Sequence, residues 1–203
     1  MRKPLARSTL ILMAIGASLL WIYFPLIQRI VTPYIAPQYR SLSSLVPESP
    51  MPVSRADVLS FPRLGIDAPL ELTENIDPFQ LGDWQVLEQS LRRGVGLIYA
   101  GNRFATAPIA YIVGHSSDAA TNPYAFIFAG LRAVKAGDVF SVTQHGQQYD
   151  YTVVHTEIVR PNDRNRFTSL ERTESGRQRV LLVTCWPLFT NTNRLVVVGE
   201  RLL

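Results

Sequence analysis

The chain has one cysteine, Cys185, and its thiol is the side chain best suited to covalent chemistry. It ends an apolar run, and Arg194 follows nine residues later (194 − 185). Acyl transfer on a thiol needs a thiolate, a proton donor for the leaving group and donors for the developing oxyanion. A lone cysteine is more often a small buried hydrophobic residue, so the rest of the chain must supply these partners.

Three histidines are the available proton donors. His145 falls in a predicted hairpin turn and His155 within a predicted strand, where each is explained as solvated or structural. His115 differs, because it follows the apolar segment YIVG and because Gly114 permits a close backbone approach. His115 and Cys185 are both expected at strand ends, where a barrel presents side chains to a cleft, although they lie 70 positions apart (185 − 115).

Arg194 is expected to supply the positive charge of the site. A hairpin joining strands at 180–185 and 194–201 would return Arg194 beside Cys185, where its guanidinium favours the thiolate. Thr184, next to the thiol, is a candidate for orienting the substrate or contributing to the oxyanion site; equally, it is an ordinary β-branched strand residue. The histidines and the cysteine lack metal-ligand spacing, and no phosphate-binding glycine loop is present. We therefore expect no metal and no cofactor.

The elements that position these residues begin near Leu59, where short β-rich segments bounded by turn residues appear. Strands or hairpins are predicted within 61–72, 107–117, 138–159, 179–185 and 194–202. Short helices are predicted at 85–94, ended by Gly94, and within 122–138, capped near Asn122. Short strands in this number, with only brief helices, favour a closed or nearly closed β-barrel.

The charge distribution argues against a nucleic-acid partner. The composition is globular, with 47% hydrophobic and 18% charged residues, and the net charge is +4. Three of the basic residues lie in the acid-free stretch 1–27, so the remainder carries 17 basic (20 − 3) against 16 acidic residues. A net charge of +1 gives no polyanion-binding face.

The N-terminus predicts a membrane anchor. Residues 8–27 contain no charge and would span about 30 Å as a helix, the thickness of a bilayer core. A cleaved signal peptide is the alternative, but the apolar run is long and no A-x-A site follows. We expect 1–27 to be a single-pass anchor in the cell membrane with a cytoplasmic N-terminus, followed by a Pro- and Ser-rich spacer, 28–58, and an extracellular domain, 59–203. An exported domain with one cysteine forms no internal disulfide, which favours a functional thiol.

The residues around the thiol resemble the signature of the sortases, cysteine transpeptidases of bacterial cell surfaces. VTC at 183–185, followed by an arginine and a strand LVVVGER, is similar to that family's nucleophile and arginine strands. YIVGHSS at 111–117 is similar to its histidine element, and FAGLRAVKAGDVFSV and LRRGVGLIYAG resemble further segments in the family's order. The resemblance implies an all-β, closed eight-stranded barrel with short helices, in which His115, Cys185 and Arg194 are catalytic.

The resemblance also implies the substrates. These are an LPxTG-like sorting-signal peptide of a surface protein, which forms a thioester with Cys185, and an amine acceptor, either a cell-wall precursor or a pilin lysine. TCWPLFTNTNRL at 184–195 is similar to the pilin-polymerising branch, class C. That branch carries a lid with an Asp-Pro-aromatic motif ahead of the barrel, whereas DPF at 77–79 follows the first predicted strand. The class is therefore left open.

Two alternative functions are compatible with the same residues. One is another exported cysteine acyl-transferase or hydrolase, such as an L,D-transpeptidase, although that class has its nucleophile in an S-H-G-C context. The other is a non-catalytic, membrane-tethered binding barrel in which Cys185 is buried.

The segment 160–179 has six arginines against three acidic residues and is expected to be a solvated loop, or by resemblance the wall of the peptide groove.

Overall fold

The computed structural model describes residues 18–19, 23–24, 57–73, 84–118 and 122–202. Residues 18–19 and 23–24 are helical, and most of the predicted anchor and spacer lies outside the described residues. In the part of the chain that is described, no helix has the length and apolarity needed to cross a membrane.

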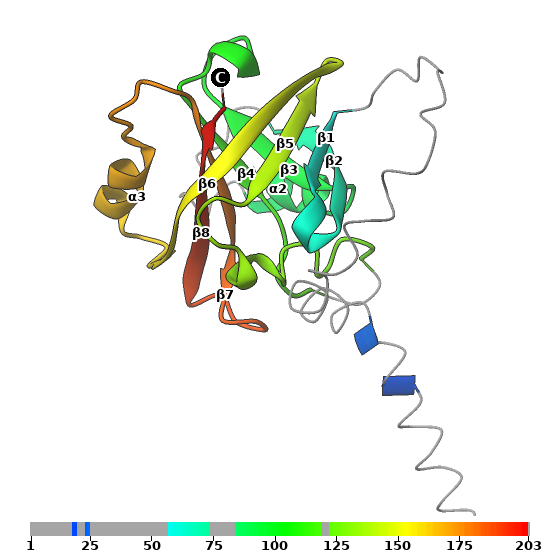
Figure 1. Ribbon diagram of the computed structural model, residues 1–203. Helices are drawn as coiled ribbons and strands as arrows, with labels where there is room; N and C mark the ends of the chain where they lie inside the picture. The colour runs from blue at the N-terminus through cyan, green and yellow to red at the C-terminus, as the bar shows by residue number, and fades with distance from the viewer. Residues whose placement is uncertain (1–17, 20–22, 25–56, 74–83, 119–121, 203) are drawn as a thin grey trace, which may run out of the picture.

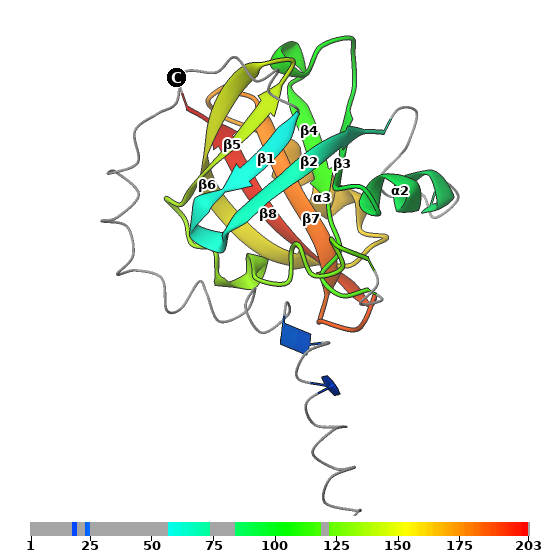
Figure 2. The same ribbon diagram turned by 90° about the vertical axis from the view of Figure 1, so that its right-hand side faces the viewer.

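The described chain forms a closed eight-stranded barrel, as predicted (Figures 1 and 2). The strands are β1 (Val58–Phe61), β2 (Ile66–Leu72), β3 (Val95–Tyr99), β4 (Ile109–Val113), β5 (Val139–Gln144), β6 (Gln147–Val159), β7 (Arg179–Trp186) and β8 (Asn193–Arg201). Around the barrel they follow the order β1-β2-β3-β4-β7-β8-β6-β5. The pairs β2–β3 and β4–β7 are parallel, and the remaining neighbours are antiparallel.

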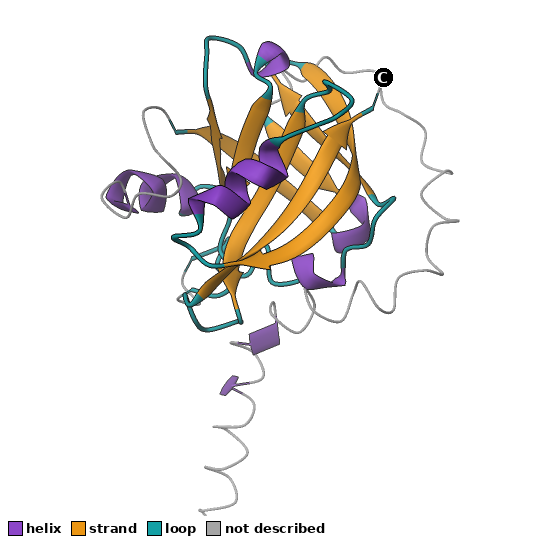
Figure 3. Cartoon of the chain, turned by 90° about the vertical axis from the view of Figure 1, so that its left-hand side faces the viewer, coloured by secondary structure: helices purple, strands orange, loops and turns teal. Residues whose placement is uncertain are grey.

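Two short α-helices lie outside the barrel. The first, α2 (Trp84–Leu91), confirms the helix predicted at 85–94, and Figure 2 shows it beside β3. The second, α3 (Arg164–Glu171), crosses the outer face of the barrel in Figure 3. Single 3-10 turns occur at η3 (Pro62–Leu64), η5 (Phe104–Thr106) and η6 (Leu131–Ala133).

The strands that carry the predicted site are buried on both faces. Along β7, Val180 and Leu182 belong to the core inside the barrel, whereas Leu181 and Val183 belong to a second apolar cluster outside it. Side chains alternate along a strand, so burial on both faces requires a continuous apolar run rather than alternation. This explains the segment RVLLV, and the same holds for the LVVV segment of β8.

The outer cluster fixes both helices against the sheet. Leu87 and Leu91 of α2 and Phe167 and Leu170 of α3 are buried in it, together with outward-facing residues of β4, β7 and β8. Burying such a side chain contributes roughly 1.5–3 kcal/mol. The position of α2 is therefore set by packing, which fixes where its polar residue Glu88 lies.

The first strand region differs from the prediction. The segment expected as one strand at 61–72 is divided between β1 and β2, because the chain turns through η3 and the left-handed Gly65 (φ +60°). The barrel also begins slightly before Leu59. The carbonyl oxygen of Asp57 accepts a hydrogen bond from the backbone N–H of Leu70 (2.9 Å), and Val58 already pairs with β2.

The helix predicted within 122–138 is wrong for most of its length. The chain forms successive turns from Pro123 to Gly130, then η6. Asn122 does accept a hydrogen bond on Oδ1 from the backbone N–H of Tyr124 (2.9 Å), but this closes a turn rather than capping an α-helix. Phe128 donates its backbone N–H to the carbonyl oxygen of His115 (2.9 Å), so a long-range bond replaces a helical one.

The solvated loop expected at 160–179 contains α3. Asp163 caps this helix by accepting a hydrogen bond from the backbone N–H of Arg166 (3.0 Å). Phe167 and Leu170, three positions apart, are buried on one side of the helix. The sequence pattern of the segment is dominated by charged residues, so these two apolar residues are easily overlooked. They are enough to pack one short helix against the barrel.

Candidate active site

The parallel pairing of β4 and β7 brings two distant parts of the chain together. Val113 is the register partner of Val183, an offset of 70 positions (183 − 113). His115 and Cys185 are separated by the same 70 positions, so each lies two residues beyond this pair. The backbone N–H of Gly114 also donates to the carbonyl oxygen of Val183 (3.1 Å), which continues the pairing toward His115.

The antiparallel pairing of β7 and β8 adds the arginine. Cys185 and Arg194 are direct register partners. Directly opposite residues on one face of an antiparallel pair have Cβ atoms about 4.5–5.5 Å apart. Cys185 is partly exposed, as a nucleophile for an external substrate must be. Arg194 donates from Nη1 to the carbonyl oxygens of Asn191 and Asn193, both at 3.1 Å.

Strand alternation places Cys185 and Arg194 on the outer face of the sheet. Cys185 has the same parity as Leu181 and Val183, and Arg194 the same parity as Val196, all of the outer cluster. The two side chains therefore share a face with α2. They lie near the β7–β8 loop, at the end of the barrel opposite the C-terminus (Figure 1).

Thr184 has the opposite parity and is only 2% exposed. Its hydroxyl donates to the carbonyl oxygen of Gly114 (2.7 Å), which joins β7 to the residue immediately before His115. Gly114 itself requires the absence of a side chain, because a Cβ there would lie 2.6 Å from Cδ2 of the buried Phe128. This close packing fixes the backbone that carries His115.

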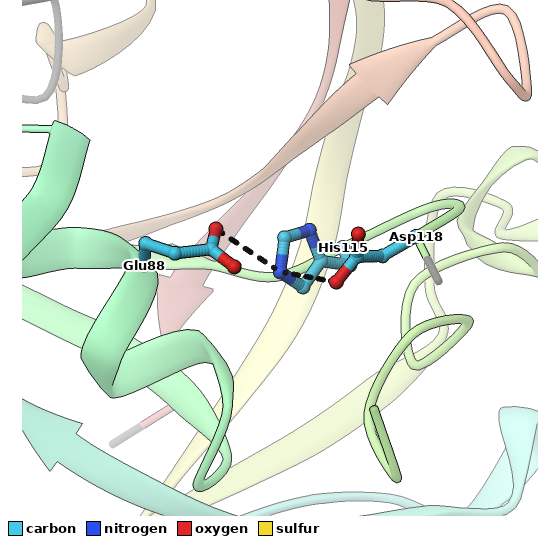
Figure 4. A group of neighbouring side chains, drawn as sticks. All are labelled: Glu88, His115 and Asp118. Carbon is cyan, nitrogen blue, oxygen red and sulfur yellow. Dashed lines mark ion pairs between the residues drawn. The ribbon is translucent and has the colours of Figure 1, made fainter. Parts of the chain in front are cut away.

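The imidazole of His115 is held between two carboxylates (Figure 4). Its side chain is 10% exposed, and Nε2 lies 3.5 Å from Oδ2 of Asp118 and 3.7 Å from Oε2 of Glu88. Glu88 comes from α2, whereas Asp118 follows His115 in the same loop. Two acidic side chains from different elements therefore face one ring nitrogen.

A hydrogen bond from a backbone N–H to a side-chain hydroxyl joins the two loops that flank the site. The backbone N–H of Phe189, in the β7–β8 loop, donates to Oγ of Ser117 (2.7 Å), two residues after His115. Phe189 has φ +65° and is 63% exposed, and its ring meets the ring of Phe126 edge-on at 6.5 Å. The loop after Cys185 and the loop after His115 are thus held together.

The remaining histidines lie as the sequence indicated. His145 is exposed in the turn between β5 and β6. His155 is half exposed on β6, where Nε2 is 2.9 Å from Oε2 of Glu157. Sequence reasoning missed Glu88 and Asp118. Asp118 could have been found from its spacing of three after His115, but nothing in the sequence marks Glu88, 27 positions before the histidine (115 − 88).

Comparisons with known proteins indicate the family. Residues 59–202 match the sortase domain family. The comparison with curated proteins found no match.

Among solved structures, sortase C-1 from Actinomyces oris is 25% identical with a TM-score of 0.56, over 86% of this chain and 88% of that one. Sortase C1 of GBS Pilus Island 1 is 24% identical with a TM-score of 0.56, over 72% of this chain and 64% of that one. Sortase A from Corynebacterium diphtheriae is 23% identical with a TM-score of 0.54, over 73% of this chain and 60% of that one. The chain thus spans less than two thirds of the length of the latter two proteins. By its domain match and its barrel, the chain belongs to the sortase family, the cysteine transpeptidases of the bacterial cell surface.

Proposed function

We propose that this sortase cleaves an LPxTG-like sorting signal through a thioester on Cys185 and transfers the acyl group to an amine. The observation that carries the proposal is the strand register. Arg194 is the register partner of Cys185 in the β7–β8 pair, and His115 follows the strand β4, which pairs in parallel with β7. This supports a site made of the three residues.

The reaction exchanges one amide bond for another and needs no redox partner. Sγ of Cys185 attacks the scissile carbonyl carbon, the S–C bond forms, and the C–N bond breaks as His115 gives a proton to the departing amine. A second amine then attacks the thioester, and its nitrogen loses a proton to His115 as the thiolate leaves. The side chains return to their starting state.

Arg194 is proposed to bind the oxyanion or the peptide backbone. Both of its hydrogen bonds to the loop use Nη1. The guanidinium is a planar fork with five N–H donors, so its other edge is suited to a carbonyl oxygen. For Thr184, whose hydroxyl donates to Gly114, we propose a contribution to the peptide site through the backbone that it holds.

The outer boundary of the peptide site is proposed to include the segment 160–179. Val159, the last residue of β6, is the register partner of Arg194, so this segment leaves the sheet beside the arginine. The segment then forms α3 on the outer face, which is the face that carries Cys185 and Arg194. Its side chains are therefore near enough to the site to influence which peptide is accepted.

The membrane topology is part of the proposal. Residues 1–27 form a single-pass anchor with a cytoplasmic N-terminus, residues 28–58 form a spacer, and the catalytic domain is extracellular. Support comes from the uncharged run at 8–27 and from the family's place at the cell surface. Protease accessibility of the domain on intact cells tests the orientation.

The acceptor amine is either a cell-wall precursor or a pilin lysine. Solved sortases of both the A and C types resemble the chain, and the DPF motif at 77–79 lies outside the described residues. Product analysis of the full-length protein with an LPxTG peptide, alone and with an oligoglycine or a lysine peptide, tests the function. Amide products are expected. Hydrolysis only, at every amine concentration, would instead identify a thiol hydrolase.

A further inference from the structure

Three ligating side chains from separate parts of the chain converge beside the catalytic strands. Glu88 from α2, His115 from the end of β4 and Asp118 from the following loop have donor atoms within 4.8 Å of one another (Figure 4). Of these three side chains, only His115 takes part in the proposed transpeptidation, so that reaction does not explain the two carboxylates.

The distances from the histidine nitrogen to the two carboxylates are longer than hydrogen bonds and close to the separation of two ligand atoms on one zinc ion. Nε2 of His115 lies 3.5 Å and 3.7 Å from the carboxylate oxygens of Asp118 and Glu88, beyond the usual hydrogen-bond length of about 2.7–3.2 Å. Tetrahedral Zn²⁺ with bonds of about 2.0–2.1 Å holds its ligand atoms about 3.4 Å apart. Small side-chain rotations would therefore close the site around one ion.

The burial of His115 is an independent sign of a missing ligand. Its side chain is nine-tenths buried, and Nε2 is a buried nitrogen without a hydrogen-bond partner in the described part of the chain. The ring directs this nitrogen between the two carboxylates (Figure 4). A bound cation would give this buried nitrogen a partner.

The carboxylates are also oriented from outside. Nδ2 of Asn122 donates to Oδ2 of Asp118 (3.0 Å), and Nε of Arg92 lies 3.5 Å from Oε1 of Glu88, leaving Oε2 toward the histidine. Outer contacts of this kind orient metal ligands. The two carboxylates together carry the negative charge that neutralises a dication.

The donor set selects the class of metal. An imidazole nitrogen with two carboxylates suits zinc and its neighbours in the first transition series, whereas Ca²⁺ and Mg²⁺ prefer oxygen ligands alone. Three protein ligands leave one position open.

We propose that Glu88, His115 and Asp118 bind a transition-metal dication of the zinc type, which reversibly inactivates the enzyme by occupying His115. The proposed inhibition rests on the proposed function, because a metal-bound imidazole no longer gives a proton to the leaving amine. The proposed metal binding does not depend on that function.

The test uses the full-length protein in detergent after treatment with a chelator. Calorimetric titration with zinc chloride is expected to show one saturable site, and Co²⁺ is expected to give the visible absorption of a tetrahedral ion. Glu88→Gln and Asp118→Asn should each weaken zinc binding by about tenfold or more. Glu157→Gln is the matched control, because Glu157 pairs with a histidine on the exposed surface, and binding should be unchanged.

The Cys185→Ala variant distinguishes zinc binding at this site from zinc binding to the thiol. The variant is expected to keep the zinc site, and zinc should slow transpeptidation by the unsubstituted protein until a chelator restores it. The proposal is overturned if the protein shows no saturable zinc binding. It is also overturned if the Cys185→Ala variant loses zinc binding while both carboxylate variants keep it. A protein that binds zinc through these residues but never forms amide products would overturn the proposed function and leave the metal site standing.

Discussion

Cys185 and Arg194 are directly opposite each other in the antiparallel pair β7–β8, on the face of the sheet that also carries the outer apolar cluster. A cation beside a thiol stabilises the thiolate, and a donor at this position also reaches an oxyanion that forms on a carbonyl attacked by sulfur. The register therefore supports the role proposed for Arg194 in the active site.

Arg194→Lys should lower transpeptidation by roughly two orders of magnitude or more, comparable with the loss of one oxyanion donor. Lysine keeps the charge but loses the planar fork that holds two acceptors together. Steady-state turnover and the melting temperature are both measured. Arg93→Lys is the control, since Arg93 is exposed and pairs with Glu71. Near-normal turnover in a well-folded Arg194→Lys protein would remove this residue from the site.

Thr184→Val should lower both stability and turnover. The change keeps the shape of the side chain but removes the hydrogen bond to the carbonyl oxygen of Gly114, leaving a buried acceptor at a cost of about 1–3 kcal/mol. Thr184→Ser keeps a hydroxyl and should recover most of the loss in thermal unfolding and in kcat. A Thr184→Val protein of normal stability with a raised KM would point to direct peptide binding instead.

Gly114→Ala should reduce turnover beyond its effect on stability. The added Cβ would press on Phe128, which costs typically about 1–3 kcal/mol in a packed core and displaces the backbone before His115. Gly199→Ala is the matched control, because its Cβ would press on Phe140 several residues along β8 from Arg194. Both variants should melt earlier, but only Gly114→Ala should lose kcat per folded molecule. Equal losses of kcat would show that the close packing at Gly114 has no special part in placing His115.

Glu157 makes a pH-dependent contribution to stability. Paired hydrogen bonds from Arg166 (2.5 and 2.6 Å) hold the pKa of Glu157 below its ordinary value of 4.5. A lowered pKa in the folded state stabilises the protein above the unfolded-state value, and this stabilisation is lost as the pH falls through the folded-state pKa. Glu157→Gln should therefore melt slightly earlier than the unsubstituted protein at neutral pH, and the two melting temperatures should converge as the pH falls through the folded-state pKa of Glu157. A gap that is constant over this range would contradict the assignment.

The barrel and its late strands could be predicted from the sequence because those strands are buried on both faces. Continuous apolar runs such as RVLLV and LVVV, bounded by polar residues, are typical of strands covered on both sides, and the turn at His145 separates β5 from β6 clearly. The short early strands were harder to predict, since β1 has only four residues and the left-handed Gly65 interrupts a segment with a continuous strand pattern. The turns after Asn122 carry apolar residues at helical spacing, but the chain forms a long-range bond from Phe128 to the carbonyl oxygen of His115 in place of a helical one.

The predicted site residues come from strands whose register is not visible in a sequence. No sequence pattern indicates that β4 lies beside β7. In the structure, paired residues of these strands are 70 positions apart, as are His115 and Cys185, and this explains why the two strand ends meet. Glu88 was missed because its contribution depends on the packing of α2 against the outer cluster, a tertiary property that no local spacing encodes.

The proposed function depends above all on the formation of a thioester between Cys185 and the sorting signal. Intact-protein mass spectrometry of the full-length protein, quenched with acid during reaction with an LPxTG peptide, measures this adduct directly. We expect one acyl adduct that disappears on treatment with hydroxylamine and that is absent from a folded Cys185→Ala protein. An equal adduct on the Cys185→Ala protein, or amide products formed without any adduct on Cys185, would contradict the proposal.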